Sequence, residues 1–342
     1  MKRLLTVASV LAISTLPVLA QAVTLNVGSY GGSTEQAFRD QIIPLYKQKT
    51  KNDVVYVPGN STDTLAKLVA QKSNPQFDVV LIDDGPMQQA QQFQLCAPLA
   101  DAPVYKDLYP LANIGKSASA LGVVATGLFY STEAFAKAGW DAPTSWHDLE
   151  DPKFKQKVVI PPVSNGYGLH TLIKFAELNG GGVKDIDPGF KAITEKVAPN
   201  VLAWEPSPGK MSELFQNGSG VIGVWGSGRV YALEATGFPV KFVYPKEGAV
   251  ALFTAVCPVA RPDAKPEAQA FVQFLLSPEV QAILAETQAW GPVNSKTKLS
   301  PEVAAAVPYG PEQIEKLESV DYSVVNAERA KWTNRWNRTV ER

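Results

Sequence analysis

The sequence predicts an α/β protein whose sheets are mainly parallel and flanked by helices. Two observations lead to this fold class. Strand-like and helix-like segments alternate along most of the chain, and strands separated by helices lie parallel in one sheet. The chain has 342 residues, of which 45% are hydrophobic. A chain of this length and composition can bury a large core and is expected to divide into two domains.

The first part of the chain repeats a unit of strand, turn and helix. Residues 24–29 alternate between apolar and polar side chains, as a half-buried strand does. Ser33-Thr34-Glu35-Gln36 follows and has the pattern of a capping box, which starts a helix. The later units consist of expected strands at 54–57 and 77–82 and expected helices at 62–71 and from residue 83 onward.

The rest of the chain continues this alternation and then becomes helical. Pro266, Pro278 and Pro311 each stand where a helix is expected to begin, a position that proline favours. The expected strands begin near 123 and lie at 158–160, 201–204, 221–225, 240–244 and 252–259, and the expected helices cover 169–178, 211–216, 266–276, 278–287, 311–317 and 322–338.

The first 22 residues have the pattern of a secretory signal peptide. Met1-Lys2-Arg3 forms a basic start, residues 4–19 are mostly apolar, and Ala20-Gln21-Ala22 fits a cleavage site. We expect residues 1–22 to be removed and the mature protein to be soluble in the periplasm. No second apolar run of that length follows that could span a membrane.

Composition excludes several classes of function. The formal net charge is −1 and the chain has no block of like charges, so no basic surface is available for a nucleic acid. Two histidines and two cysteines are too few for zinc fingers or cysteine-rich metal sites. We therefore expect no metal and no cofactor. Whether Cys96 and Cys257 form a disulfide in the oxidising periplasm or remain free thiols stays open.

One apparent nucleotide motif has the wrong surroundings. The segment 218–223, Gly-Ser-Gly-Val-Ile-Gly, matches the G-x-G-x-x-G spacing. A dinucleotide site needs a strand before this motif and a helix after it, whereas here the expected helix precedes and the expected strand follows. The motif therefore does not predict nucleotide binding.

An exported α/β hydrolase is the alternative function. His147 follows a turn at the start of a helix, and His170 stands at the start of another helix, so either could act as a base. No serine lies in the G-x-S-x-G pattern of a nucleophile elbow. Enzymatic activity is therefore not expected.

Several turns that follow expected strands carry small, aromatic or charged side chains just before a helix. Ligands of open α/β sheets collect at such places, where helix amino termini offer N–H groups and glycine lets the backbone come close. The candidate ligand-binding residues are Tyr30, Gly31, Gly32, Asp83, Asp84, Ser164, Asn165, Tyr167, Trp225 and Arg229, together with Trp204 and Glu205 after a further strand.

Each candidate also has a structural explanation. Glycine, serine and aspartate before a helix form turns and caps, as Asp84 could. Large aromatic side chains such as Trp225 pack in cores, and Arg229 could lie on a solvated helix face. The sequence leaves both readings open.

Several further motifs are spread over nearly the whole mature chain. They are Ser29-Tyr30-Gly31-Gly32, Phe77-Asp78-Val79-Val80 with Asp83-Asp84, 143–149 (Pro-Thr-Ser-Trp-His-Asp-Leu), 151–155 (Asp-Pro-Lys-Phe-Lys), 244–248 (Tyr-Pro-Lys-Glu-Gly) and 275–281 (Leu-Leu-Ser-Pro-Glu-Val-Gln). Together they resemble the motifs of the extracellular solute-binding proteins of ABC importers, in particular the polyamine, opine and thiamine branch.

The resemblance implies a two-lobed periplasmic-binding-protein-like type II fold. Each lobe would be a mainly parallel sheet flanked by helices, and strands that cross near 125–128 and 242–253 would join the lobes. Residues 23–124 and 250–342 would form the first lobe and 125–249 the second. A ligand would be held between them and delivered, by a monomer, to a membrane permease with its ATPase.

The resemblance also bears on the ligand. Polyamine-binding members carry an aromatic residue and an aspartate after the Pro-Lys-Glu-Gly turn, where this chain has Leu252 and Thr254. Arg229 would suit a carboxylate and repel a polycation. Among polyamine, opine and thiamine-like solutes, we therefore expect a zwitterionic, opine-like or amino-acid-derived ligand, with Asp83, Asp84 and Glu205 toward its amine and Thr254 in the site.

Overall fold

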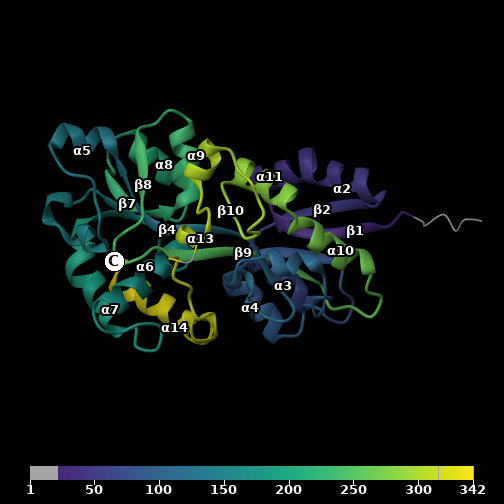
Figure 1. Ribbon diagram of the computed structural model, residues 1–342. Coiled ribbons are helices and arrows are strands. Elements are labelled where there is room, and N and C mark those ends of the chain that lie inside the picture. The colour runs from purple at the N-terminus through teal and green to yellow at the C-terminus, as the bar shows by residue number, and fades with distance from the viewer. Residues whose placement is uncertain (1–21, 315, 342) are drawn as a thin grey trace, which may run out of the picture.

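The computed structural model describes residues 22–314 and 316–341. The expected signal peptide lies outside these residues, except for Ala22. One continuous sheet of ten strands runs through the described part of the molecule, with helices on both faces (Figure 1). The strands are β1 (Thr24–Tyr30), β2 (Asp53–Gly59), β3 (Val79–Asp83), β4 (Ser119–Ser131), β5 (Val158–Ile160), β6 (Val201–Trp204), β7 (Ile222–Gly226), β8 (Val240–Val243), β9 (Val250–Pro258) and β10 (Gly291–Pro292).

The helices follow the strands in alternation and then dominate the carboxyl-terminal part. A π-helical turn at Phe38–Ile42 joins the first two helices into one. The helices are α1 (Ser33–Ala37), α2 (Ile43–Thr50), α3 (Ser61–Ala70), α4 (Asp84–Gln92), α5 (Thr132–Ala138), α6 (Gly166–Leu178), α7 (Asp187–Ala192), α8 (Pro208–Gln216), α9 (Ser227–Ala235), α10 (Pro266–Leu275), α11 (Pro278–Gln288), α12 (Pro301–Ala306), α13 (Pro311–Ile314) and α14 (Tyr322–Thr339).

The strand order is β2-β1-β3-β9-β4-β7-β5-β6, and β8 and β10 also pair with β4. The outer strands are parallel to their neighbours, as in β1 with β2 and β3 and in β5 with β6 and β7. The central strands β9 and β4 run antiparallel. The first part of β4, up to Thr126, pairs with β9, and the part from Thr126 on pairs with β7 and β8.

Two sets of buried side chains form on the two sides of this central crossing. One side holds the apolar residues of β1, β3, α2 and α10 with the beginning of β4. The other side holds those of β5, β7, α6 and α14 with Leu128 of β4. Because β4 contributes to both, the two cores meet along this strand, and Figure 1 shows the corresponding two bodies of helices around one sheet.

The last helix, α14, packs against the second of these cores. Trp332 and Trp336 are 5% and 0% exposed and belong to the same buried cluster as Leu169. The start of α14 also contacts the first core, where the Asn326 Nδ2 donates to the Gly85 carbonyl at 3.0 Å. We therefore propose that α14 belongs to the second lobe, with residues 125–249, although residues 250–342 were expected to form part of the first lobe.

Cys96 and Cys257 form a disulfide whose Cα atoms are 5.8 Å apart. Both are buried in an apolar cluster with Val80 and Ile82 of β3. The question that the sequence left open is therefore answered in favour of the bond. The bond closes a loop of 161 residues, and restricting a loop of that size raises the free energy of the unfolded chain.

We expect the double variant Cys96→Ala/Cys257→Ala to lose about 3 to 5 kcal/mol of unfolding free energy, because its unfolded state regains the entropy that the bond removes. Urea denaturation of the oxidised wild type and of the variant measures this loss. Chemically reduced wild type is the matched control and should unfold at the same urea concentration as the variant. Equal midpoints for all three would show that the bond contributes nothing.

Candidate functional site

A cavity of about 830 Å³ lies between the two cores, where strands end and helices begin. Its walls come from the ends of β1 and β3 on one side and from α6 and α9 on the other, and β4, β9 and the end of α11 complete it. The lining residues are Tyr30–Thr34, Gly59, Asp83, Val124, Tyr167, Gly228, Arg229, Tyr231, Ala232, Ala235, Leu252, Thr254 and Glu286–Trp290.

On the first side, a tyrosine and a carboxylate are joined at the ends of neighbouring strands. The Tyr30 hydroxyl donates to Asp83 Oδ1 at 2.7 Å, and the Asp83 amide donates to Ser61 Oγ at 3.0 Å. The Tyr30 ring meets the Trp290 ring edge to face at 6.1 Å. Burial raises the pKa of Asp83, while the hydrogen bond from Tyr30 opposes that rise. A ligand ammonium at this carboxylate would stabilise its ionised form.

On the second side, two arginines bring positive charge toward Asp83. Arg229 lies in the first turn of α9 and beside Tyr167, and Arg329 of α14 donates to the Ser164 carbonyl at 3.0 Å. Both charges act to lower the pKa of Asp83. Asp83 on one side therefore lies opposite Arg229 on the other, with the charge of Arg329 acting on Asp83 as well, a distribution that suits a ligand carrying both signs of charge.

The amino terminus of α9 adds polar backbone to this side. Its N-cap residue, Gly226, provides no side-chain cap, and Gly228 and Arg229 of the first turn line the cavity. Uncapped amides at the start of a helix favour negative groups. Arg229 and the amino terminus of α9 therefore both favour a negatively charged group of the ligand.

Of the thirteen predicted site residues, seven line this cavity: Tyr30, Gly31, Gly32, Asp83, Tyr167, Arg229 and Thr254. They come from five segments far apart in sequence. Asp83 and Thr254 are paired partners on the neighbouring strands β3 and β9, which places the Thr254 hydroxyl directly beside the Tyr30–Asp83 pair.

The two predicted tryptophans lie in the cores. Trp225 is 4% exposed and packs on Phe129, with ring centroids 5.5 Å apart. Trp204 is half-buried and meets the Trp336 ring edge to face at 4.8 Å. Their structural reading as packing residues therefore accounts for their positions.

Four polar candidates are engaged in hydrogen bonds within the protein. Glu205 accepts a hydrogen bond from the Ser207 amide at 2.8 Å, and Asn165 caps α6 by accepting from the Tyr167 amide at 2.9 Å. Ser164 contributes its carbonyl to Arg329. Asp84 is 9% exposed and accepts from the amides of Gly85 at 2.9 Å and Phe253 at 3.3 Å.

The segment at the end of α11 is part of the cavity but was not among the predicted residues. Gln288 Oε1 accepts from Thr34 Oγ1 at 2.9 Å and from Ser33 Oγ at 3.1 Å, which ties this segment to the start of α1. Trp290 lies just after Ala289, which has a left-handed φ of 50°. No local pattern marks these residues, because long-range contacts of α11 with α1 and the pairing of β10 with β4 bring them to the cavity.

The two histidines do not face this cavity. His147 is exposed, and its Nδ1 lies 3.2 Å from Glu150 Oε1. His170 is 0% exposed, with Nδ1 2.8 Å from Thr126 Oγ1 and Nε2 2.9 Å from the Tyr322 hydroxyl. Burial lowers the pKa of His170 to about 3. The hydrolase alternative is therefore not favoured.

The stability of the protein should depend on pH through His170 and Asp84 with opposite signs. Burial, with the charge of Asp83 second, raises the pKa of Asp84 to about 7. Between about pH 4 and 6.5 the folded state therefore holds a proton on Asp84 that the unfolded state lacks, while the unfolded state holds one on His170 that the folded state lacks. The two contributions largely cancel in the wild type.

Replacing one of these two residues should make the pH dependence due to the other visible in the free energy of unfolding. The unfolding free energy of Asp84→Asn should rise with pH relative to wild type over this range, and that of His170→Gln should fall relative to wild type. Urea unfolding at pH 4.5, 5.5 and 6.5 measures both. Asp148→Asn, in a half-buried capping box remote from both groups, is the control. Parallel profiles for all four proteins would contradict the assigned protonation states.

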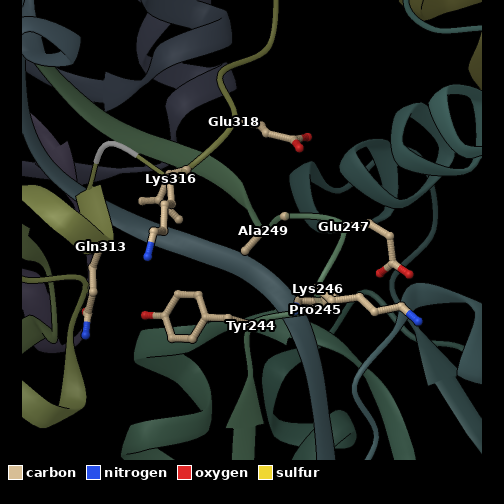
Figure 2. A pocket seen from close by; sticks show the side chains of 10 residues that line it. Tyr244, Pro245, Lys246, Glu247, Ala249, Gln313, Lys316 and Glu318 are labelled. Carbon is tan, nitrogen blue, oxygen red and sulfur yellow. The ribbon is translucent and has the colours of Figure 1, made fainter.

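A second cavity of about 590 Å³ lies at the connection between β8 and β9. Figure 2 shows Tyr244, Lys316 and Gln313 on one side of it and the carboxylate of Glu318 directed elsewhere. Two of its carboxylates already have partners, since Glu318 pairs with Lys174 and Glu247 accepts from the Ser145 hydroxyl at 2.6 Å. The cavity between the cores is therefore the better ligand site, because it gathers charged groups from both sides.

Among residues 22–314 and 316–341, no group of three or more His, Cys, Asp or Glu side chains could hold a metal ion. Within the same residues, no helix is both long and apolar enough to cross a bilayer.

Comparisons with known proteins bear on the family. Residues 41–309 match the family described as bacterial extracellular solute-binding protein. An uncharacterised protein of Haemophilus influenzae is 32% identical over 224 residues, which are 63% of this chain and 60% of that protein. The spermidine/putrescine-binding periplasmic protein of Salmonella typhimurium is 27% identical over 164 residues, 47% of this chain and 46% of that protein. The alignments thus span between about half and three fifths of these relatives.

Solved structures share the fold over nearly the whole chain. An ABC transporter structure from Clostridium perfringens has a TM-score of 0.81 at 24% identity and covers 92% of this chain and 99% of its own. A GABA receptor has a TM-score of 0.77 at 20% identity and covers 92% and 96%. The predicted two-lobed type II binding-protein fold and the resemblance to solute-binding proteins are confirmed.

Proposed function

Because the chain belongs to the bacterial extracellular solute-binding proteins, a family of binding proteins and not of enzymes, we propose that it is the receptor of an ABC importer for a small zwitterionic solute. The observation that carries this proposal is the charge pattern of the cavity. Asp83 lines one side and Arg229 the other, and the charge of Arg329, from outside the lining, also acts on Asp83. A ligand with an amine and a carboxylate satisfies both sides at once.

The amine end belongs at Asp83. The Tyr30 and Trp290 rings beside this carboxylate offer aromatic surface to a cation, and a desolvated ammonium gains from such surface. The carboxylate end belongs at Arg229 and the start of α9. Only Arg side chains offer the planar pair of donors that a carboxylate accepts from in parallel.

A pure polyamine fits this cavity less well. Although one relative is named for spermidine and putrescine, the second ammonium of a diamine would face Arg229. Leu252 and Thr254 line the cavity beside Asp83 without adding a carboxylate there, and the other carboxylate of the lining, Glu286, is exposed to solvent. A thiamine-like cation likewise leaves the arginines without an anion. Among the three ligand classes, an opine-like or amino-acid-derived solute is the best match.

We expect 4-aminobutyrate to stabilise the ligand-stripped protein against heat more than putrescine or butyrate does, because it alone carries both charges. A ligand at a hundred times its dissociation constant adds about 2.7 kcal/mol to the free energy of unfolding, which thermal unfolding detects as a shift of a few degrees.

Arg229→Ala should weaken the binding of the zwitterion by about 30-fold, the equivalent of about 2 kcal/mol for a lost charged hydrogen bond. Arg335→Ala removes an arginine that pairs with Asp187 outside the cavity and should leave affinity unchanged. Stabilisation by putrescine but not by 4-aminobutyrate, retained in Arg229→Ala, would make this a polyamine site.

We expect ligand binding to close the two lobes, because the groups that hold the ligand lie on both of them. Small-angle scattering should show a smaller radius of gyration at saturating ligand. A radius that stays the same while calorimetry reports full occupancy would mean that the solute docks on a rigid site.

The proposal extends to the partners and the location of the protein. A monomer would deliver the solute to a membrane permease and its ATPase from the periplasm, after cleavage behind Ala22. The basic and apolar start of the sequence supports this export. Amino-terminal sequencing of protein from the periplasmic fraction identifies the first mature residue directly.

A further inference from the structure

A buried chain of hydrogen bonds crosses from one core to the other beside the cavity. Thr126 Oγ1 lies 2.8 Å from His170 Nδ1, and His170 Nε2 lies 2.9 Å from the Tyr322 hydroxyl. That hydroxyl in turn hydrogen-bonds to the Asp84 carboxyl. The four side chains come from β4, α6, α14 and α4. They are all buried, with exposed fractions of 0% to 9%.

Each of these hydrogen bonds can form with either partner as the donor, so the whole series can run from Thr126 toward Asp84 or from Asp84 toward Thr126. If Asp84 is ionised, it accepts from the Tyr322 O–H, whose oxygen accepts from His170 Nε2–H, and Nδ1 accepts from the Thr126 O–H. If Asp84 is protonated, it donates to the Tyr322 oxygen. The Tyr322 O–H then donates to Nε2, and Nδ1–H donates to Thr126. Each direction requires a different neutral tautomer of His170.

We propose that the proton on Asp84 sets the direction of this whole chain and the tautomer of His170, and thereby couples the ligand site at Asp83 to the contact between the lobes. Asp84 and His170 are positioning residues in this role, since neither lines the ligand cavity. The bonds are present in both directions, so the proton changes their polarity without breaking the contact.

The charged groups around Asp84 support a transition near neutral pH. Its neighbour Asp83 disfavours a second negative charge, whereas Arg329 of α14 favours it. From β9 the Phe253 amide donates to Asp84, and Asp321, before α14, shares the small cavity beside it. Burial first and the charge of Asp83 second raise the pKa of Asp84 to about 7, against the hydrogen bonds from the Phe253 and Gly85 amides and from Tyr322. His170 stays neutral over this range, because burial lowers its pKa to about 3.

The link to ligand binding rests on the proposed function. The charge on Asp83 helps Asp84 to retain its proton. An ammonium placed on Asp83 cancels that charge, so Asp84 should release its proton when the ligand binds near pH 7. The chain would then change direction as the solute enters.

The direct test is nitrogen NMR of ligand-free protein labelled with ¹⁵N-histidine, in a His147→Gln background that leaves His170 as the only imidazole. A protonated and a bare ring nitrogen differ strongly in chemical shift. We expect the Nδ1–H tautomer below pH 6 and the Nε2–H tautomer above pH 8, with a midpoint near the Asp84 pKa of about 7.

Two variants decide whether Asp84 is the cause. Asp84→Asn removes the titrating group, and Tyr322→Phe keeps the ring but removes the hydroxyl that links Asp84 to His170. Both should hold His170 in one tautomer mixture at every pH, whereas Asp321→Asn should retain the change. A single tautomer in the His147→Gln protein from pH 5.5 to 8.5, or a change that persists in Asp84→Asn or Tyr322→Phe, would overturn the proposal.

Calorimetry with 4-aminobutyrate at pH 7, in two buffers of different ionisation enthalpy, tests the coupling. We expect release of up to one proton per ligand bound by wild type and none by Asp84→Asn. If the ligand binds without proton release to protein that still shows the pH-dependent tautomer change of His170, the proposed coupling is wrong. The placement of the amine at Asp83 is then wrong as well. The ligand-free NMR result would then stand on its own.

Discussion

The architecture depends on the sharing of β4 between the two halves of the sheet. Up to Thr126 this strand pairs with β9, and beyond Thr126 it pairs with β7 and β8. Its side chains therefore enter both cores. The hydrogen-bonded ladder of the sheet continues without a break from one core to the other. The ligand cavity lies at this change of partners, because the strand ends and helix starts of both cores meet there. Its position follows from the topology rather than from any single residue.

The same crossing explains how buried polar groups can sit between the cores. Thr126, at the change of partners, points its hydroxyl at His170. Buried polar groups are costly unless each has a partner, and here each donor meets an acceptor on another element. Asp84 is adjacent in sequence to Asp83, but its side chain belongs to this buried chain and not to the cavity. Two neighbouring carboxylates thus differ in environment because α4 begins between them.

Much of the fold was predictable because its signals are local. The alternation of strands with helices, the proline starts of α10 and α11, and the glycine-rich turn at Gly31-Gly32 are each visible within a few residues. Of the predicted cavity residues, Tyr30 and Asp83 at the ends of strands and Arg229 in the first turn of a helix carry a local signal, whereas Thr254 lies inside β9 and was expected only from the family resemblance. Gln288 and Trp290 carry no such signal, since β10 brings them in from a distant part of the chain. Trp225 lies within β7, whose five residues are all buried, so its position in the strand does not distinguish a core side chain from a ligand contact, and its ring packs on Phe129.

The disulfide joins the two chain segments of the first core around everything that lies between them. The residues of β5, β6, β7 and β8 all fall between Cys96 and Cys257, so the strands of the second core lie within a covalent ring, whereas α14, which packs on the same core, lies outside it. A proteolytic cut in any surface loop of that core opens the ring but leaves both segments of the first core attached to each other. The order of synthesis gives the ring a further property. Cys96 is translated 161 residues before its partner, so the ring cannot close until the strands of the second core have left the ribosome.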